Sequence, residues 1–334
     1  MEKGPEIWFN GRFYEGDPPV GGLFYHGLHY GTAAWEGIRR IGNNLLKLSN
    51  HVARLNFGSD SLGIGWPFKE DDFSQVILET ARRNPECDYL RPVVGWGPGR
   101  DIYRSVGVLP KESVPFFAVL PQKFGSYLGE EAEALGVDVF VSSYKSVPPS
   151  SLPNERKLAG GYLNRFLAKM EAHRGGYREA LMLCDLPDGR EVVSEGTGEN
   201  IFMEQEDGVL FTPTKDAGIL PGITRETIIK ELAPDLGIKI EERDFTLNEL
   251  KKAKGAFFTG TAVGVGPIRS VNYRFLGSVN EAIFWKGPKT ETIRKVKNTY
   301  EDACAGKIPK YEHWLTAIPS EEVEELEQLA QVLN

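Results

Sequence analysis

One lysine has neighbours that would suit amine chemistry. Lys157 follows a Pro-rich loop and precedes the small residues Ala159, Gly160 and Gly161 and the aromatic Tyr162. Most lysines are solvated surface residues, and that is the simpler interpretation of any single one. A crowded, partly dry setting would instead lower the pKa of the amine and free it to attack a carbonyl carbon. The local composition leaves both interpretations open.

A glutamate framed by glycines lies between two apolar runs, in the segment 194–200 (SEGTGEN). A carboxylate at a strand end with small neighbours can point into a cleft. There Glu195 could hold a pyridine nitrogen protonated and strengthen the ring as an electron sink. A polar turn with a solvated glutamate explains the same residues equally well.

Two further segments could hold an anion. In 220–226 (LPGITRE) a Pro-Gly turn precedes a helix, whose first N–H groups and the Thr224 hydroxyl could cradle a phosphate. An ordinary capped helix is favoured locally, because most helix starts bind no anion. In 259–264 (TGTAVG) small side chains would let a ligand approach the backbone, or would simply form a tight strand-to-loop turn.

Metal and serine-hydrolase chemistry are not predicted. His26 and His29 have no cysteine or carboxylate cluster nearby to complete a ligand set, so hydrogen-bonding histidines in a loop are preferred. The three cysteines, at 87, 184 and 304, have no short spacing typical of a zinc site or a disulfide framework. No Gly-x-Ser-x-Gly segment is present in the sequence.

Composition is that of a folded protein with two domains. The 334 residues are 41% hydrophobic and 26% charged, with a net charge of −8 and both signs interspersed. This charge disfavours nucleic acid as a partner. No apolar run reaches the roughly 18 residues of a spanning helix, and the polar start does not resemble a signal peptide. We therefore expect a cytoplasmic protein with no membrane partner.

The periodicities predict strands in hairpins first and a mixture of strands and helices later, which favours two α+β domains. Asn10–Gly11 predicts a tight hairpin turn, Ser49 a helix cap, and Thr246 with Glu249 a capping box. Strands are expected at 7–9, 12–14, 89–94, 116–120, 137–144, 179–185, 191–194, 201–204 and 209–212, and at 256–258. Helices are expected at about 49–62, 70–83, 158–173 and 224–232, and as an acidic amphipathic tail from Pro319.

The domain boundaries follow from composition. Residues 1–124 are expected to form a small N-terminal domain. The Gly- and acid-rich stretch 121–136 has weak periodicity, and its part 125–136 is the predicted interdomain loop. Residues 137–334 would form a larger domain with a C-terminal helical tail. No Gly-x-Gly-x-x-Gly follows a strand, so a dinucleotide-binding fold is disfavoured.

Taken together, these segments resemble the class IV (fold type IV) aminotransferases, with the branched-chain amino acid aminotransferases as the nearest group. The resemblance spans roughly Ile7 to Gly306. It is carried, in order, by 26–32 (HGLHYGT), 35–39 (WEGIR), 89–92 (YLRP), 157–162 (KLAGGY), 194–200 (SEGTGEN), 220–225 (LPGITR) and 260–262 (GTA). Several motifs in the right order are far more specific than any one of them.

The resemblance implies a two-domain fold with a small N-terminal α/β domain and a larger C-terminal domain with a pseudo-barrel. It implies pyridoxal 5'-phosphate as cofactor. Lys157 matches the lysine that holds the cofactor as a Schiff base and shuttles the proton at Cα. Glu195 matches the acid at the pyridine nitrogen, and Tyr162 the tyrosine at the cofactor hydroxyl. The remaining cofactor-binding positions it implies are Arg54, Gly198, Leu220, Gly222, Ile223, Thr224 and Thr261.

The resemblance also implies a substrate pocket. Arg91 matches an arginine that receives the distal carboxylate of glutamate, and Tyr89 with the backbone of Thr261 and Ala262 matches the group that holds the α-carboxylate. The apolar walls would be Tyr30, Trp35, Phe124, Tyr127 and Tyr162. Tyr30 and Val108 correspond to residues lent by a neighbouring subunit, so at least a homodimer is expected.

The expected reaction is transamination between a branched-chain L-amino acid and 2-oxoglutarate. Three positions depart from the usual pattern: Trp35 replaces a phenylalanine, 94–106 is longer, and 263–265 (VGV) replaces Ala-Glu-Ile. They leave the substrate range open. Alternatives of the same fold are a D-amino acid aminotransferase, an (R)-amine transaminase and an aminodeoxychorismate lyase. An alternative of another class is a non-catalytic cofactor-binding or scaffold protein.

Overall fold

The computed structural model describes residues 4–16, 22–69, 71–99, 107–273, 281–285, 290–323 and 326, and its chain divides into two compact units. Unit 1 comprises Met1–Gly125, Arg156–Gly160 and Cys304–Asn334. Unit 2 comprises Ser126–Glu155 and Gly161–Ala303. The first unit therefore also takes the segment with Lys157 and the C-terminal region, neither of which the sequence assigned to it.

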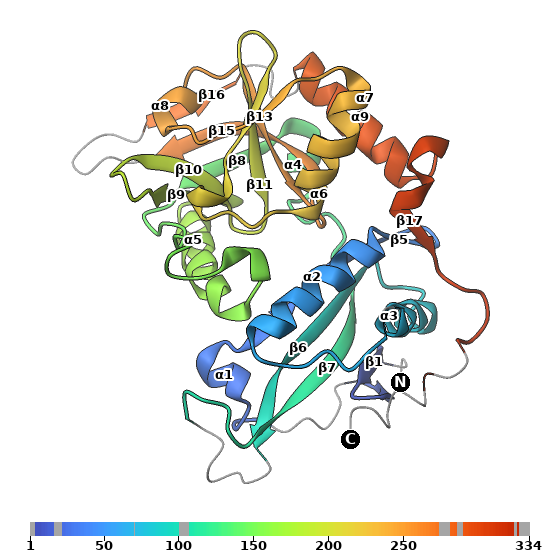
Figure 1. Ribbon diagram of the computed structural model, residues 1–334. Coiled ribbons are helices and arrows are strands. Elements are labelled where there is room, and N and C mark those ends of the chain that lie inside the picture. The colour runs from blue at the N-terminus through green and yellow to red at the C-terminus, as the bar shows by residue number, and fades with distance from the viewer. Residues whose placement is uncertain are drawn as a thin grey trace. The chain divides into compact units, whose positions relative to one another are not determined.

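The described part of unit 1 contains an eight-stranded sheet in the order β17-β5-β4-β6-β7-β1-β2, with β3 paired to β6 (Figure 1). The predicted hairpin at Asn10–Gly11 is confirmed, and both residues have the positive φ that its turn requires, 43° and 86°. The strands are β1 (Glu6–Phe9), β2 (Arg12–Glu15), β3 (Ala33–Trp35), β4 (Ile38–Ile41), β5 (Asn44–Leu46), β6 (Tyr89–Gly99), β7 (Ser113–Gln122) and β17 (Leu315–Ala317).

Two helices of unit 1 cover this sheet: α2 (Leu48–Ser61) contacts β3 and β6, and α3 (Asp72–Arg83) contacts β1, β6 and β7. The apolar face of α3 is buried as its periodicity predicts, with Phe73, Val76 and Ile77 at 0% exposure. A short helix, α1 (His26–Tyr30), precedes β3. The predicted Ser49 cap is wrong, because α2 begins one residue earlier and Lys47, with φ 50°, stands at its start.

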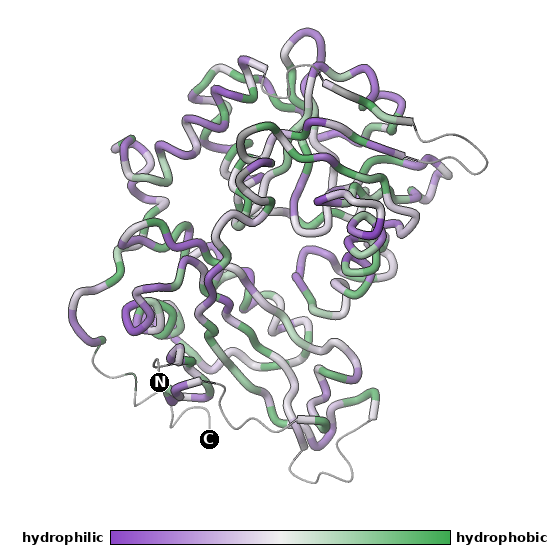
Figure 2. Tube along the Cα trace, turned by 180° about the vertical axis from the view of Figure 1, so that it is seen from behind, coloured by the Kyte–Doolittle hydropathy of each residue, from purple (hydrophilic) through white to green (hydrophobic). Residues whose placement is uncertain are grey.

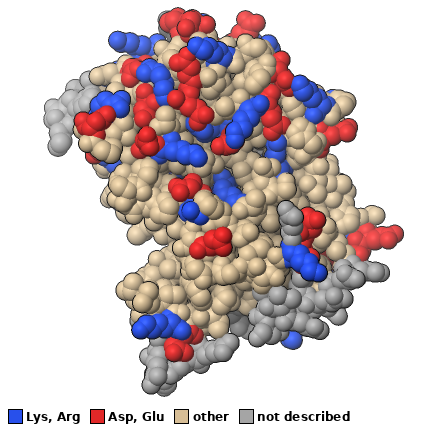
Figure 3. Space-filling model, viewed as in Figure 1, with Lys and Arg blue, Asp and Glu red and all other residues tan. Residues whose placement is uncertain are grey.

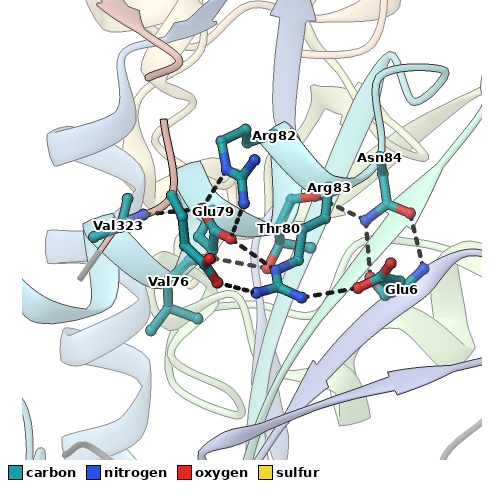
Figure 4. A network of polar contacts seen from close by, with 9 residues as sticks. Glu6, Val76, Glu79, Thr80, Arg82, Arg83, Asn84 and Val323 are labelled. Atoms are coloured by element: carbon teal, nitrogen blue, oxygen red, sulfur yellow. Dashed lines mark hydrogen bonds and ion pairs between the residues drawn. The ribbon is translucent and has the colours of Figure 1, made fainter. Parts of the chain in front are cut away.

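The C-terminal segment around Val323 is bound to α3 by a network of hydrogen bonds and ion pairs (Figure 4). The carboxylate of Glu79, fully buried, accepts hydrogen bonds from Arg82 Nη2 at 2.6 Å and Arg83 Nε at 2.7 Å. The Val323 N–H donates to the same carboxylate at 3.3 Å, and Glu322 pairs with Arg83 at 2.7 Å. The helix predicted from Pro319 lies for the most part outside the described residues.

Unit 2 is built on a nine-stranded sheet, and six of its strands close into a barrel. The order β10-β9-β8-β15-β14-β11 returns to its start because β11 also pairs with β10, through the single register pair Glu195↔Asn200. The predicted pseudo-barrel is thereby confirmed. The strands are β8 (Val137–Val141), β9 (Glu179–Asp185), β10 (Glu191–Gly196), β11 (Asn200–Glu204), β12 (Leu210–Thr212), β13 (Ile240–Glu242), β14 (Gly255–Gly260), β15 (Gly264–Tyr273) and β16 (Glu281–Phe284).

The helices of unit 2 pack on the outside of these strands (Figure 1). They are α4 (Glu130–Leu135), α5 (Tyr162–Arg174), α6 (Ile223–Thr227), α7 (Ala233–Leu236), α8 (Leu247–Leu250) and α9 (Glu291–Cys304). A π-helical turn (Ile228–Leu232) joins α6 to α7, so the helix predicted over 224–232 is confirmed and continues further. The predicted capping box of α8 is confirmed in both hydrogen bonds.

Two predictions in this region are wrong. The stretch 121–136 is not a bare connection, because β7 runs to Gln122 and Glu130–Leu135 forms α4. The helix expected from Leu158 begins only at Tyr162, after a single 3-10 turn over Ala159–Gly161. The glycines there weaken an α-helix, and the segment before them pairs with β3 instead.

Each unit has its own apolar core, and the hydrophobic stretches of the chain follow the sheet strands (Figure 2). Charged side chains of both signs are interspersed on the face seen in Figure 3. Among the described residues, none of the helices has the length and hydropathy needed to span a bilayer.

Candidate functional site

The predicted site residues fall in both units. In unit 1 are Tyr30, Trp35, Arg54, Tyr89, Arg91, Val108, Phe124 and Lys157. In unit 2 are Tyr127, Tyr162, Glu195, Gly198, Leu220, Gly222, Ile223, Thr224, Thr261 and Ala262. Each unit is described by itself below.

Lys157 has an unusual backbone conformation. Its φ of 51° lies in the left-handed region, which costs a residue with a side chain roughly 1–3 kcal/mol and persists only where the surroundings enforce it. The enforcement comes from the pairing of the residues that follow Lys157. Leu158 forms an antiparallel bridge with Ala34, and the Gly160 N–H donates to Gly31 O at 3.0 Å. Strain of this kind clusters at functional sites.

Trp35 holds two cations against its ring. The Lys157 ammonium lies 4.3 Å from the ring centroid, and the Arg91 guanidinium carbon 4.4 Å from it. Both distances are within the range of cation–π attraction. Trp35 therefore fixes the amine of Lys157 and the guanidinium of Arg91 in one neighbourhood of unit 1.

Arg91 lies among aromatic rings. Its guanidinium carbon is 5.8 Å from the centroid of Phe124 and 5.9 Å from that of Tyr89, and those two rings are 4.5 Å apart. Its Nε is buried without a hydrogen-bond partner among the described residues. A buried donor left unpaired is costly, so this nitrogen is suited to an acceptor brought by a ligand.

The position of Tyr89 depends on a glycine. A Cβ at Gly37 would lie 1.6 Å from the Tyr89 hydroxyl oxygen, so any side chain there would displace the ring. The predicted group of Trp35, Tyr89, Arg91 and Phe124 is thus brought together in unit 1.

Arg54 is held by a buried carboxylate. Its Nε and Nη2 donate to Glu36 at 2.5 and 2.8 Å, and the Nδ1–H of His51 donates to the same group at 2.7 Å. Burial would raise the pKa of Glu36, but Arg54 and then His51 outweigh it and bring that pKa well below its ordinary value. Burial lowers the pKa of His51, against the opposing charge of Glu36. Sequence reasoning included Glu36 in the motif 35–39 without giving it a role in the site, and it missed His51.

In unit 2, Glu195 lies at the pair that closes the barrel. It is 1% exposed, and its carboxylate accepts from Asn200 Nδ2 at 3.0 Å and from the Leu220 N–H at 3.1 Å to each oxygen. Asn200 stands opposite Glu195 in the register, which places both side chains on one face. Burial excludes the interpretation of Glu195 as a solvated turn residue.

A third donor to Glu195 was not predicted. Arg165 Nη2 donates at 2.5 Å, and the guanidinium carbon lies 5.3 Å from the ring centroid of Tyr162. Arg165 is 8% exposed, while Ala168 and Ala172 of the same helix are fully buried. The spacing 165, 168, 172 marks one helix face, and an arginine on it was the available signal.

The start of α6 is built close to Asn200. The Asn200 amide donates to Leu220 O at 2.7 Å, and a Cβ at Gly222 would lie 2.2 Å from its oxygen. Gly222 is the N-cap residue and supplies no side-chain cap. The hydroxyl of Thr224, which is 4% exposed, lies 3.5 Å from that of Tyr300.

Arg225 anchors the start of α6, and the sequence did not predict this role. It is 1% exposed and donates to Pro213 O and Glu242, both at 2.8 Å, and to Thr212 Oγ1 at 3.2 Å. A fully buried arginine with these partners anchors α6 to β12 and β13. Ile223 and Thr224 are therefore held at a fixed place beside β12 and β13.

Thr261 and Ala262 lie in the three-residue loop of the β14–β15 hairpin, between the paired Gly260 and Gly264. A Cβ at Gly260 would lie 3.3 Å from Gly198 O, so this loop lies beside the turn that follows Glu195. The hydroxyl of Tyr127 would be 3.2 Å from a Cβ at Gly198. These predicted residues of unit 2 are neighbours.

Tyr30 and Val108 are exposed, at 41% and 76%. The fully buried His26 links the two segments. Its ring lies 4.7 Å from that of Tyr30, and its nitrogens form hydrogen bonds with Thr32 Oγ1 and with the O of Gly107, the neighbour of Val108, both at 2.7 Å. The histidines predicted to be hydrogen-bonding do bond in this way, although they lie on the helix α1 and not in a loop. No group of metal-binding side chains is found in the part of the chain described.

Comparison with known proteins settles the family, since the model of amino-transferase class IV matches residues 33–271. The chain belongs to the class IV aminotransferases. It is 34% identical to a branched-chain-amino-acid aminotransferase of Pseudomonas aeruginosa over 93% of this chain and 97% of that one. The solved T.th. branched-chain amino acid aminotransferase with pyridoxamine 5'-phosphate superposes with a TM-score of 0.82 at 32% identity, covering 96% of this chain and all of that one. The Escherichia coli enzyme gives 0.83 at 30% identity, over 95% and 100%. The predicted family and fold are thus confirmed.

Proposed function

We propose that this class IV aminotransferase uses pyridoxal 5'-phosphate to exchange an amino group between branched-chain L-amino acids (leucine, isoleucine and valine) and 2-oxoglutarate. The observation that carries the substrate assignment is the aromatic group of unit 1 around one cation, Arg91. Apolar walls suit a branched side chain, and Arg91 with its unpaired Nε suits a distal carboxylate. One pocket would accept both substrates.

Similar proteins support this assignment. The names of the relatives from Pseudomonas aeruginosa and Escherichia coli state the branched-chain activity. Two further structures of the T.th. protein, each covered over its full length with a TM-score of 0.79, carry 4-methylvaleric acid and N-(5'-phosphopyridoxyl)-L-glutamate, respectively. Those ligands are a branched apolar acid and a phosphopyridoxyl adduct of glutamate, and they carry the two side-chain classes expected here.

The residues fit the cofactor on structural grounds. The uncapped helix start at Gly222 and the buried hydroxyl of Thr224 are suited to a phosphate. Glu195, buried with fixed donors, is suited to a cationic ring nitrogen. The proposed cofactor contacts are Arg54, Lys157, Tyr162, Glu195, Gly198, Leu220, Gly222, Ile223, Thr224 and Thr261. When bound, the cofactor supplies an aldehyde that condenses with amines and a ring that takes up electrons released at Cα.

The chain's own residues would do the rest. Lys157 anchors the cofactor covalently and carries the proton to and from Cα, so one amine serves as nucleophile and general base. Glu195 accepts the hydrogen bond of the protonated ring nitrogen. Arg54, held by Glu36, offers a guanidinium to the phosphate. Tyr89, with Thr261 and Ala262, holds the α-carboxylate, while Trp35, Phe124, Tyr127 and Tyr162 line the side-chain space.

A second copy of the chain is proposed to complete the site. Six large hydrophobic side chains of unit 1 are exposed near the His26–Gly107 hydrogen bond: Leu23, Phe24, Leu28, Tyr30, Val108 and Leu109, at 41–77%. Exposed apolar patches of this kind mark interfaces. In the proposed homodimer Tyr30 and Val108 reach the partner's pocket.

The decisive test is reduction of the holoenzyme with borohydride, followed by peptide mass spectrometry. The phosphopyridoxyl label is expected on Lys157, and a label elsewhere or none contradicts the proposal. Lys157→Ala should fold and lose transamination by more than about a thousandfold, since general acid–base catalysis alone contributes ~10²–10⁴. Leucine should be a better donor than D-alanine or 1-phenylethylamine with 2-oxoglutarate. Turnover of D-alanine alone would refute the substrate.

Two variants test finer parts. Arg91→Met should raise KM for glutamate far more than KM for leucine, because only glutamate brings a distal carboxylate; equal effects would contradict the role of Arg91. For the dimer, Val108→Asp and Lys157→Ala should each be inactive and regain activity when mixed, since a mixed dimer has one intact site. Failure to regain activity while mixed dimers are detected would contradict the lending of Val108.

A further inference from the structure

Among the described residues of unit 2, three buried glutamates lie near two cations that form ion pairs with them. Glu179 on β9, Glu195 on β10 and Glu199 in the turn before β11 are 0%, 1% and 3% exposed. Arg165 and Lys169 stand one turn apart on α5 and point at this group. Because an unpaired buried charge is expensive, one of the three acids is expected to carry a proton.

Each of these two cations is paired with a carboxylate. Arg165 Nη2 lies 2.5 Å from Glu195 Oε1, and Lys169 Nζ bonds to Glu179. Glu179 also accepts from Thr197 Oγ1 at 2.6 Å. Both acids are thus held as carboxylates by charge-assisted hydrogen bonds.

Glu199 accepts fewer hydrogen bonds than the other two acids. Its Oε1 is buried without a partner among the described residues, and the Gly198 N–H donates to its Oε2 at 3.1 Å. Burial, and then the charges of Glu179 and more weakly Glu195, raise the pKa of Glu199 to about 8, although Lys169 opposes them. Glu199 is therefore the acid that is neutral at neutral pH.

Arg165 remains a cation in this setting. Burial would lower its pKa, but Glu195, through its charge and its hydrogen bond, outweighs burial and raises it. Its guanidinium also lies 5.3 Å from the ring centroid of Tyr162. Arg165 thus touches both Tyr162 and Glu195, the residues proposed for the cofactor hydroxyl and the ring nitrogen.

We infer that Arg165 is a positioning residue for Glu195, the acid proposed to meet the cofactor ring. It keeps Glu195 in the carboxylate form, while Glu199 carries the proton. The inference rests on the proposed function, in which Glu195 meets the ring nitrogen. A proton shared by a buried acid and a pyridine nitrogen can reside on either atom. By stabilising the carboxylate of Glu195, Arg165 biases that proton toward the nitrogen, the form that withdraws electrons from Cα.

Infrared difference spectroscopy of the apoprotein at neutral pH tests the proton assignment directly. The carbonyl-stretch region of protonated carboxyl groups should show a buried acid band in the wild type that disappears in Glu199→Gln. Arg165→Met should add a second band, because Glu195 then takes a proton, and Arg165→Met/Glu195→Gln should lack it. Arg165→Met without the second band would overturn the inference.

Cofactor affinity is the second readout. Arg165→Met should raise the Kd for pyridoxal 5'-phosphate about tenfold or more, the loss expected when one hydrogen bond to a charged group is weakened. The matched control is Arg269→Met, which removes the Arg269–Asp138 pair of the same unit and should leave Kd unchanged. A Kd that does not change, or that changes equally in the control, would refute the role.

The design separates folding and function. If Arg165→Met does not fold, Arg165→Lys, which keeps a cation, should restore the wild-type bands with a weaker Kd, and a second acid band in this variant would overturn the inference. Failure of wild-type protein to bind pyridoxal 5'-phosphate would refute the proposed function instead, while the infrared spectra of the apoprotein would still report the ionisation of Glu195.

Discussion

Replacing Glu36 by alanine should strongly destabilise unit 1. Glu36 is fully buried and accepts from Arg54 at 2.5 and 2.8 Å and from His51 at 2.7 Å. Its removal takes this buried carboxylate away from Arg54, whose side chain is 13% exposed. Breaking a buried pair in this way costs about 3–5 kcal/mol. At about 2 °C per kcal/mol for a chain of this size, Tm should fall by roughly 6 °C or more.

The assay is thermal and urea unfolding of purified holoenzyme, with Glu86→Ala as matched control. Glu86 also pairs with a cation of unit 1, Lys123 at 2.7 Å, but its side chain is 80% exposed. Exposed pairs contribute about 0–1 kcal/mol, so this control should unfold almost as the wild type does. Equal small losses in both variants would refute the argument that burial makes the Glu36 pair important.

The pH dependence of stability provides a second test of the Glu36 pair. The folded pKa of Glu36 lies well below its ordinary value of 4.5. A lowered carboxyl pKa contributes stability that is complete above the unfolded value and declines as pH falls from there toward the folded value. The difference between wild type and Glu36→Ala should therefore be constant above about pH 5 and shrink in acid. A difference that grows on acidification would contradict the assigned ionisation.

Three further predictions follow from single groups. Burial lowers the pKa of His51 below 6.5, so the contribution of His51 to stability is complete above that pH and is lost as pH falls below it. In His51→Gln, the free energy of unfolding from denaturant titrations should therefore depend less on pH just below 6.5. Gly222→Ala should weaken binding of pyridoxal phosphate, measured by absorbance titration, because its Cβ would meet the Asn200 oxygen at 2.2 Å, whereas Gly65→Ala, with nothing within 4 Å, should have no effect. Burial, helped by nearby acids, raises the pKa of Cys184 to about 11, so iodoacetamide should not label it in the folded protein at neutral pH, and labelling before unfolding would contradict this.

Locally encoded features were predictable from sequence. The turn at Asn10–Gly11 and the capping box of Thr246 and Glu249 formed as expected, because each is decided by residues within four positions of one another. The predicted Ser49 cap failed for the opposite reason. Lys47 donates its N–H to Trp314 O at 2.6 Å, and this distant contact sets where α2 begins.

The candidate site was predictable only in part. The motif residues Lys157 and Glu195 carried a resemblance that pointed to them, but Arg165, a partner of Glu195, lies outside every motif. Arg165 reaches Glu195 across 30 positions, from α5 to β10, and Arg225 reaches Glu242 across 17, from α6 to β13. A pairing between residues on different elements has no signature in either element alone.

Buried charge separates the requirements of stability from those of chemistry in this fold. Desolvation offsets most of the attraction in a pair such as Arg165–Glu195, so apolar side chains of similar volume would hold the barrel at least as well. The buried pairs nevertheless occur where the backbone is also constrained. In unit 1 the charge of the left-handed Lys157 acts on His51, a partner of Glu36, and in unit 2 the pair lies at the single register pair that closes the barrel. Stability gives no reason for this coincidence. Under the proposed function, the amine of Lys157 must be fixed in unit 1 and the carboxylate of Glu195 must stay ionised in unit 2. Each task requires both the charges and a rigid backbone that holds them, so the positions of these pairs support the proposed catalysis more strongly than their number does.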